Sequence, residues 1–207
     1  MIVTKRPKKT LLLFLAITLL AIPSSVSAFQ IGLKGGYHFY PSSDFFDFLE
    51  ESPLNVGAGD LNGPSAEIFV DLSILPLISL ELGVGGYTSE TSISSLEAEL
   101  KLAATYLLLT PKVHLLPASS WDIYFGLGGG YYFVDQTVRV VSDLLPGDET
   151  GVFGFHANLG LGYKLAGNLL ILVEGRYAKV TAEDFAGLGR DLELGGTFIQ
   201  GGLAVTW

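Results

Sequence analysis

Charged side chains inside strand-like segments are the residues of this sequence best placed for chemistry. Glu174 and Arg176 lie two positions apart, and Glu99 and Lys101 have the same spacing. Side chains two positions apart on a β-strand point to the same face of the sheet. A carboxylate and a cation spaced in this way can form an ion pair, and charges on neighbouring strands can extend the pair into a network.

The three histidines, His38, His114 and His156, are the other candidates. A hydrolase needs a nucleophile, a base and an orienting carboxylate within hydrogen-bond reach of one another. No histidine here has a serine two positions later. His156 and Glu174 fall on neighbouring predicted strands and could pair, which we interpret as a hydrogen bond inside the fold. No spacing of metal ligands stands out, so the sequence predicts no catalytic residue, no metal and no cofactor.

Eight segments alternate apolar residues with polar or small ones, which is the period of β-strands. In one of them, Ile171 and Val173 alternate with Leu172 and Glu174. The fourth segment is the least regular, since consecutive leucines break the alternation and Pro111 lacks a backbone donor. A bulge or an early end is expected there. The predicted strands are Phe29–Tyr40, Ser65–Ser73, Ser79–Thr88, Glu97–Leu115, Trp121–Asp135, Val152–Leu165, Leu169–Val180 and Leu194–Trp207.

The connections between these strands alternate strictly between long and short. Long connections span residues 41–64, 89–96, 136–151 and 181–193, and the three short ones between them span residues 74–78, 116–120 and 166–168. Barrels of bacterial outer membranes are built in this way, with an even number of strands, long extracellular loops and short periplasmic turns. The sequence therefore predicts an all-β fold, an eight-stranded antiparallel up-and-down transmembrane β-barrel. The first and last strands would pair and leave no sheet edge.

One face of the predicted strands is apolar, and the other holds glycine, amides, histidine and charges of both signs. A Lys or Arg facing lipid near the membrane midplane costs about 2–4 kcal/mol, so we expect the charged face to point inward. An eight-stranded lumen is just wide enough for side chains. We predict a buried ionic network that fills the lumen, with a gate as the less favoured alternative. Its predicted members are Lys34, Glu67, Asp71, Glu81, Glu99, Lys101, Lys164, Glu174 and Arg176.

The first residues of the chain read as a secretory leader. Basic residues precede an apolar run from Leu11 to Ile22, and Val26-Ser27-Ala28 is a small-residue cleavage pattern. We expect residues 1–28 to be a cleaved signal peptide and residues 29–207 to form the barrel domain. A retained anchor is disfavoured, because the apolar run of about 12 residues is shorter than the roughly 20 that a spanning helix needs.

Composition supports a lipid-facing strand protein. Beyond the predicted leader there are eight basic and 21 acidic residues, a net charge of −13, which argues against nucleic-acid binding. Only 16% of all residues are charged, 26 are glycine, none is cysteine, and the mean hydropathy is +0.45. A soluble secreted ligand-binding barrel is disfavoured, because it would keep its apolar side chains inside and a polar face outside.

Aromatic residues gather near the ends of the predicted strands. Trp121, Tyr163 and Trp207 lie near the short connections, and Trp207 ends the last strand. Outer-membrane barrels carry aromatic girdles at both membrane interfaces, so we interpret both groups as girdles. The group near the long connections comprises Tyr37, Phe39, Tyr40, Tyr87, Tyr131, Tyr132 and Phe133.

The leader, the glycine-aromatic strand from Tyr124 to Phe133, the hairpin from Gly160 to Tyr177 and the terminal strand together resemble the small outer-membrane β-barrel family of the OmpX, OmpW and OmpA-barrel kind. The resemblance implies residence in the outer membrane of a Gram-negative bacterium, reached through the periplasm. It implies contact with outer-membrane lipids and lipopolysaccharide. It also implies that the outer-membrane assembly machinery reads the terminal strand, with Trp207 as the C-terminal signal where Phe is more usual.

Three classes of function remain open at this stage. We favour a structural or interaction protein, or a narrow pore for small solutes, and we expect a monomer without enzyme activity. A lipid A-modifying barrel enzyme and a soluble ligand-binding barrel are the alternatives. The long loops are acidic and could bind a divalent cation or another extracellular ligand, although a solvated, repulsive surface is the favoured interpretation. Ser43 to Glu50 could form a short amphipathic helix over the rim.

Overall fold

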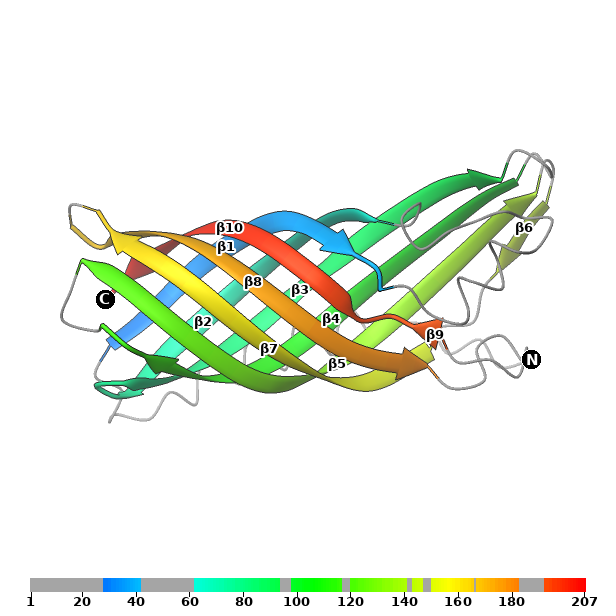
Figure 1. Ribbon diagram of the computed structural model, residues 1–207. Coiled ribbons are helices and arrows are strands. Elements are labelled where there is room, and N and C mark those ends of the chain that lie inside the picture. Colours follow the sequence, from blue (N-terminus) through cyan, green and yellow to red (C-terminus); the bar gives the residue numbers. More distant parts are fainter. Residues whose placement is uncertain are drawn as a thin grey trace.

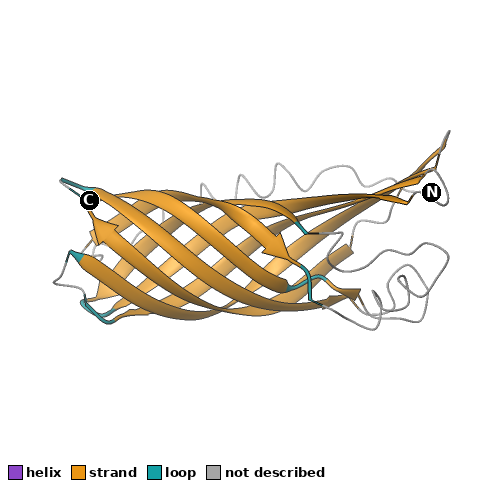
Figure 2. Cartoon of the chain, turned by 45° about the horizontal axis from the view of Figure 1, so that its top comes forward, coloured by secondary structure: helices purple, strands orange, loops and turns teal. Residues whose placement is uncertain are grey.

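The computed structural model is a closed barrel of antiparallel strands (Figures 1 and 2). It describes residues 28–41, 62–93, 98–116, 120–140, 143–146, 150–165, 167–182 and 192–207, and of residues 90–93, 98–101, 135–140, 143–146, 150, 182 and 192 it describes only the backbone. The predicted leader up to residue 27, the segment from Ser43 to Glu50 and most of the acidic loops lie outside the described residues. Cleavage after Ala28 stays a prediction.

Eight long strands build the wall, and six of them begin and end within two residues of the predicted segments. The predicted third and fifth strands are too short, because β3 and β5 continue well beyond Thr88 and Asp135. Two further strands were not predicted: β6 (Asp143–Pro146) pairs with β5, and β9 (Leu192–Glu193) pairs with β8. The long strands are β1 (Ala28–Phe39), β2 (Gly63–Leu75), β3 (Ile78–Ile93), β4 (Ala98–His114), β5 (Trp121–Val140), β7 (Thr150–Lys164), β8 (Leu169–Ala182) and β10 (Gly196–Thr206).

The barrel closes between its first and last strands, as predicted. The strands follow the order β10-β1-β2-β3-β4-β5-β7-β8, and β10 also pairs with β8, so the ring is complete. β1 and β10 stay in register from Gln30 opposite Thr206 to Phe39 opposite Thr197. Every pair is antiparallel, which is the arrangement that short turns between consecutive strands allow.

Strand β4 passes straight through Pro111. Leu109 lies opposite Gly129 and Lys112 lies opposite Gly126, so the register with β5 is the same on both sides of the proline. On the other side, β3 pairs with Pro111 through Leu80. The expected bulge or early end is therefore wrong, because the pairing around the proline outweighs the one missing donor.

The barrel has two unlike ends. The C-terminus lies at the end where β2 joins β3 through Pro76 and Leu77 and where β7 joins β8, which we call the short-turn end (Figure 1). At the opposite, long-loop end, β3, β4, β5 and β6 continue beyond the ends of β1 and β8 as a projecting sheet (Figure 1). β1 ends at Phe39, whereas β3 and β4 remain paired out to Ile93 and Ala98. The projecting sheet is therefore formed by strands and not by loops alone.

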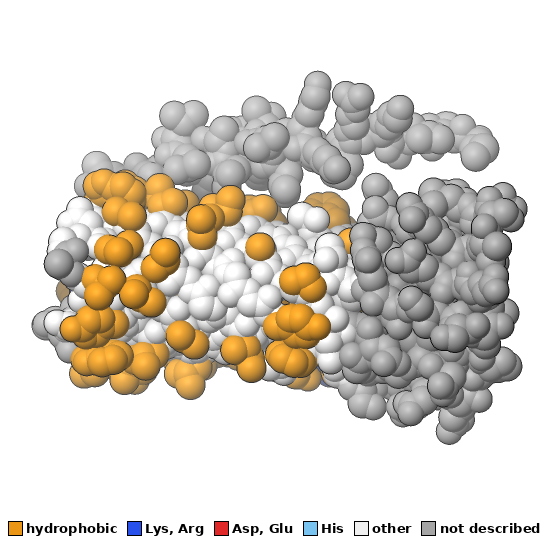
Figure 3. All heavy atoms as spheres, turned by 90° about the horizontal axis from the view of Figure 1, so that it is seen from above, with side chains coloured by type: hydrophobic (Ala, Val, Ile, Leu, Met, Phe, Trp, Pro, Cys, Tyr) orange, Lys and Arg blue, Asp and Glu red, His pale blue; other side chains and the backbone are white. Residues whose placement is uncertain are grey.

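The outer face of the wall is apolar. Phe155, Leu159 and Leu33 are 66%, 63% and 61% exposed. Seen from above, hydrophobic side chains group toward the two ends of the described wall, with backbone and small residues between them, and no charged side chain shows on the described part of this face (Figure 3). No helix within the described ranges is long and apolar enough to cross a membrane.

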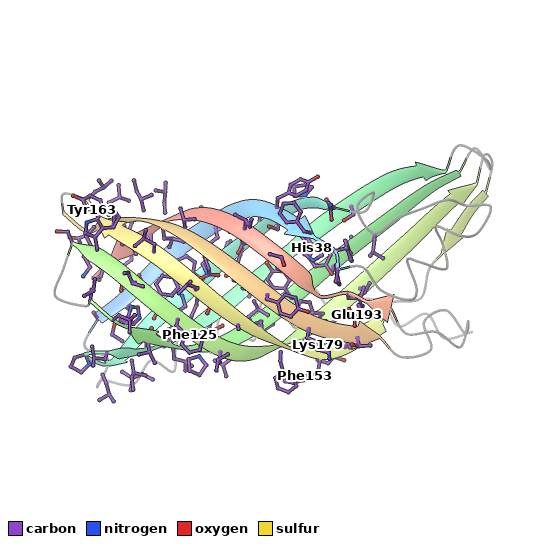
Figure 4. All side chains as sticks on the ribbon, in the orientation of Figure 1. His38, Phe125, Phe153, Tyr163, Lys179 and Glu193 are labelled. Carbon is purple, nitrogen blue, oxygen red and sulfur yellow. The ribbon has the colours of Figure 1, made fainter. Side chains whose placement is uncertain are left out.

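Aromatic residues ring the outer wall at both ends. Trp121 and Tyr163 pack at 4.7 Å between ring centroids near the short-turn end, and Phe153 and Phe155 pack at 5.0 Å nearer the other. Figure 4 shows Phe125, Phe153 and Tyr163 on the outside. The girdle interpretation is wrong for three predicted residues, because their side chains are buried inside the barrel: Tyr40, Tyr87 and Tyr132.

The start of the first long strand and the end of the last one meet at the short-turn end of the barrel. The rings of Phe29 and Trp207 stack, with centroids 4.9 Å apart and an interplanar angle of 11°. The Trp207 backbone amide donates to the Phe29 carbonyl at 2.9 Å, and the Phe29 amide donates to the Trp207 carbonyl at 3.3 Å. The last residue is therefore held in place by both backbone and ring contacts.

Replacing Trp207 by alanine should remove the ring stack and leave the backbone pairing. Aromatic pairs contribute about 0.5–1.5 kcal/mol beyond the area they bury, so the free energy of unfolding should fall by about that amount. Urea unfolding of the refolded barrel in lipid vesicles measures it. Trp207→Phe, which keeps a ring against Phe29, should lose less than Trp207→Ala; equal losses in both variants would contradict a role for the stack.

Candidate functional site

The inward faces of the strands carry a buried cluster of charged side chains with Arg176 in the middle. The guanidinium binds the Glu67 carboxylate through both terminal nitrogens, at 2.7 and 3.0 Å, and Nη2 also donates to Glu174 at 2.9 Å. A planar guanidinium suits such two-point contacts with carboxylates. Arg176, Glu67 and Glu174 are all at most 2% exposed, so these three side chains are bonded to protein groups and are shielded from water.

Lys34 on β1 contacts carboxylates of three other strands, β2, β3 and β8. Its ammonium donates to Glu67 at 3.1 Å, to Glu81 at 2.9 Å and to Glu174 at 3.1 Å. It also lies 4.7 Å from the centroid of the Phe69 ring. An ammonium has three N–H donors, and the three carboxylates use all of them. The buried charge of Lys34 is therefore fully hydrogen-bonded, as a buried cation requires.

Lys112 is a member of the cluster that the sequence analysis missed. Asp71 and Glu81 lie directly opposite each other on β2 and β3, and like charges in such positions repel. The Lys112 ammonium pairs with Glu81 and lies 3.5 Å from Asp71, so it holds these two carboxylates together. The signal was available: the inward residues of β4 are even-numbered from Leu102 onward, and Lys112 continues that series past Pro111.

Tyr124 adds a neutral group to the charged cluster. Its hydroxyl donates to Glu174 at 2.9 Å, and the Lys112 ammonium lies 4.3 Å from the centre of its ring. Cations favour the face of an aromatic ring. We define the charge cluster as the seven charged residues joined by these contacts: Lys34, Glu67, Asp71, Glu81, Lys112, Glu174 and Arg176.

Six of the nine predicted members thus lie together inside the barrel, one does not, and the side chains of the other two are not described. Lys164 is the last residue of β7 and is exposed, because the strand ends there at the rim, so its predicted place in the network is wrong. The side chains of Glu99 and Lys101 lie outside the described part of the chain. The expected pair of His156 and Glu174 is also wrong, because His156 lies opposite Ala178 on β8 and bonds to the Thr110 hydroxyl at 2.7 Å.

Apolar and aromatic side chains fill the lumen between the charge cluster and the long-loop end. The His38 ring lies 4.1 Å from the ring of Tyr87 and 4.3 Å from that of Phe198, between centroids. The Tyr87 hydroxyl donates to the Leu194 carbonyl at 2.7 Å. We define the upper plug as the buried side chains of this layer: His38, Tyr40, Tyr87, Leu102, Ala104, Tyr106, Leu108, Tyr132, Val134, Ala178, Val180, Leu194 and Phe198.

Two different groups lie on the short-turn side of the charge cluster. β2, β8 and β10 contribute an apolar group, the lower plug, of Phe69, Leu170, Leu172 and Ala204. β3, β4 and β5 contribute a polar chain, in which Ser79 Oγ lies 2.8 Å from His114 Nε2 and His114 Nδ1 lies 2.9 Å from Asp122 Oδ1. The sequence analysis did not predict this contact. His114 and Asp122 are only eight residues apart, on either side of a short connection, but Ser79 is 35 residues from His114 and meets it only through strand pairing.

The carboxylates of the charge cluster are not available as metal ligands. They are taken up by Lys34, Lys112 and Arg176. Among the residues that the structure describes, no group of three histidine or acidic side chains is arranged to hold a metal ion. What the geometry provides is a closed set of ion pairs that crosses the lumen.

A family model supports the assignment of the fold. The model for the outer membrane protein beta-barrel domain matches residues 11–205. The chain belongs to this family. It is an outer-membrane β-barrel protein of a Gram-negative bacterium, so its short-turn end faces the periplasm and its long-loop end faces outward. No curated protein matches the sequence.

Solved structures of small outer-membrane barrels share the fold at low sequence identity. The outer membrane protein OprG from Pseudomonas aeruginosa is 15% identical, with 88% of this chain and 97% of that chain covered and a TM-score of 0.57. Neisserial surface protein A is 15% identical, with 86% and 98% covered and a TM-score of 0.56. A major outer membrane protein from Thermus thermophilus is 13% identical, with 86% and 99% covered and a TM-score of 0.54. At such identities the likeness concerns the fold alone.

Proposed function

We propose that this protein is a plugged outer-membrane barrel that acts as a structural or interaction protein at its surfaces and does not conduct solutes through its lumen. The observation that carries the proposal is the charge cluster, whose ion pairs join β1, β2, β3, β4 and β8 across the lumen. The upper plug on one side and the lower plug on the other add bulk above and below it. A pore would require several of these buried contacts to break together.

The projecting sheet supports a role at the outer surface. β3, β4 and β5 remain paired beyond the ends of β1 and β10, out to Ile93, Ala98 and Val140. Its sequence is polar for a strand, with Ser89-Glu90-Thr91-Ser92 in β3. A paired sheet held above the membrane gives a partner a better defined surface than long loops alone. Contact of the outer wall with lipopolysaccharide, recognition of Trp207 by the assembly machinery and a monomeric state belong to the same proposal.

The net charge of the chain narrows the class of extracellular ligand. A solved structure of Ail from Yersinia pestis contains the heparin analogue sucrose octasulfate. This chain, with 21 acidic residues against eight basic ones beyond the predicted leader, should repel such a polyanion. A cationic or neutral ligand fits its charge better.

Planar-bilayer recording of the refolded barrel tests the plugged lumen. We expect no steady current above that of the bare lipid, because the ion pairs and both plugs occupy the lumen. Faster migration of the unboiled protein on SDS gels should establish that the recorded protein is folded. Steady ohmic current steps from the folded wild-type barrel would overturn the proposal in favour of a narrow pore.

A further inference from the structure

We propose that Ser79, His114 and Asp122 form a serine-nucleophile site at the periplasmic end of the lumen, which hydrolyses small uncharged acyl esters. Three consecutive strands supply the three side chains. Ser79 is the second residue of β3, His114 is the last residue of β4, and Asp122 is the second residue of β5. Because these strands pair side by side and meet at the short turns, the residues lie on the inner face at one level of the barrel.

The hydrogen bonds place each group in the role that a catalytic triad assigns to it. His114 Nδ1 lies 2.9 and 3.1 Å from the two oxygens of Asp122. A carboxylate only accepts hydrogen bonds, so Nδ1 carries the proton and donates it. The other nitrogen, Nε2, is then free to accept the hydroxyl proton of Ser79, at 2.8 Å. This is the order of nucleophile, base and orienting carboxylate that activates a serine.

The other two histidines of the lumen lack this combination. His156 Nε2 lies 2.7 Å from the Thr110 hydroxyl, but its Nδ1 has no hydrogen-bond partner among the described residues. His38 Nε2 donates to the Gly195 carbonyl at 2.9 Å, so it is not available as a base. Thr110 and His156 are therefore a built-in comparison: a hydroxyl–imidazole pair without the carboxylate that sets the tautomer.

A cation lies beside the proposed nucleophile. Lys112 is the cross-strand partner of Ser79 between β4 and β3, and both residues are buried on the inner face. The ion pairs with Glu81 and Asp71 hold Lys112 in place. The strand pairing thus puts a cation next to Ser79, and the charge of this cation is shared with the two carboxylates.

Burial limits the substrate to small acyl groups. Ser79 and Asp122 are 2% and 4% exposed, whereas the side chain of His114 is 13% exposed. Access is thus by way of His114, from the periplasmic side. The nearby carboxylates of Asp71, Glu81 and Asp122 disfavour anionic substrates, and the burial of Ser79 favours a small acyl group. A short neutral ester is the substrate class that remains.

The proposed hydrolysis requires only Ser79, His114, the ester and water. Ser79 Oγ attacks the ester carbonyl and gives its proton to His114 Nε2, which passes the proton to the departing alkoxide as the ester C–O bond breaks. Water then attacks the acyl-serine, His114 takes a proton from the water, and the acyl–Oγ bond breaks with return of that proton to Ser79. An alcohol and a carboxylic acid leave, and no cofactor is consumed.

Diisopropyl fluorophosphate tests the nucleophile directly, because it is small, uncharged and reacts with activated serines with loss of fluoride. We expect mass spectrometry of the refolded barrel to find the adduct on Ser79, and hydrolysis of p-nitrophenyl acetate to be lost on the same time course. Ser79→Ala should abolish both. Asp122→Asn should slow both by up to about 10⁴-fold, the effect of the same change in a serine protease.

Thr110→Val is the matched control, because it removes the hydroxyl of the pair that has no carboxylate. It should leave labelling and hydrolysis within about twofold of wild type. Heat-modifiable migration of every variant establishes that each is folded. Absence of an adduct on Ser79 in folded wild-type protein, or equal hydrolysis by Ser79→Ala, overturns the proposal. The outcome is independent of the bilayer recordings, since a plugged barrel can hydrolyse an ester at its periplasmic mouth.

Discussion

Replacing Arg176 by alanine should lower the free energy of unfolding of the barrel by about 3–5 kcal/mol, the cost of leaving buried charges without their partner. Glu67 would lose two hydrogen bonds and Glu174 would lose one. Both carboxylates are fully buried, so water cannot replace the guanidinium. Lys34 would remain close to them, but one ammonium already shared among three carboxylates cannot compensate.

Urea unfolding in lipid vesicles, followed by tryptophan fluorescence and by gel migration, measures this effect. Lys164→Ala is the matched control. It removes a cation of the same barrel from an exposed rim position, where contacts of a charge contribute at most about 1 kcal/mol to the free energy of unfolding. Arg176→Ala with Glu67→Gln in one chain should recover part of the loss, because a buried negative charge disappears with its partner. Equal stability of wild type and Arg176→Ala would refute the cluster as a structural element.

The charge cluster was largely predictable because side-chain alternation is a property of the strand itself. Glu174 and Arg176 had to share a face, and the cost of exposing Arg to lipid decided which face. Lys112 was missed because the run Leu107-Leu108-Leu109 hides the alternation: Leu108 faces the lumen, whereas Leu109 faces outward. Lys164 was misplaced because alternation gives the face of a residue and not its depth along the barrel.

The contact of Ser79, His114 and Asp122 could not be predicted in the same way. Alternation can place each residue on the inner face, but it does not give their common level. That level depends on the register between β3, β4 and β5, where Ser79 lies opposite Lys112 and Lys112 lies opposite Gly126. Tyr87 and Tyr132 were misplaced for a different reason: their residue type suggested a girdle, although alternation along β3 and β5 already places them on the inner face.

Small residues decide how the large side chains of the lumen fit. Gly160 on β7 lies directly opposite Tyr124 on β5 and opposite Glu174 on β8. The Tyr124 ring lies over Gly160, so that a β-carbon built there would overlap the ring and its hydroxyl. The ring is held from its other sides by the hydrogen bond to Glu174 and by the Lys112 ammonium. Only glycine at position 160 lets the Tyr124 ring lie against the backbone of β7.

Replacing Gly160 by alanine should therefore destabilise the barrel by about 1–3 kcal/mol, the usual cost of overpacking a filled interior. The added methyl group must push the Tyr124 ring away from Glu174, which breaks a hydrogen bond inside the charge cluster. Urea unfolding in vesicles measures the loss. In a Tyr124→Phe background the penalty should be smaller, because the hydroxyl that the methyl group overlaps and the bond that it breaks are both gone.

Gly175→Ala provides the control for a change of glycine to alanine in a neighbouring strand. Gly175 lies in β8 opposite Leu159 and is exposed on the outer wall, and a β-carbon there meets nothing within 4 Å. Its substitution should leave stability unchanged or raise it slightly, because alanine reduces the conformational entropy of the unfolded chain. If Gly160→Ala were as harmless as Gly175→Ala, the Tyr124 ring would have room to move, and the lumen around the charge cluster would not be tightly packed.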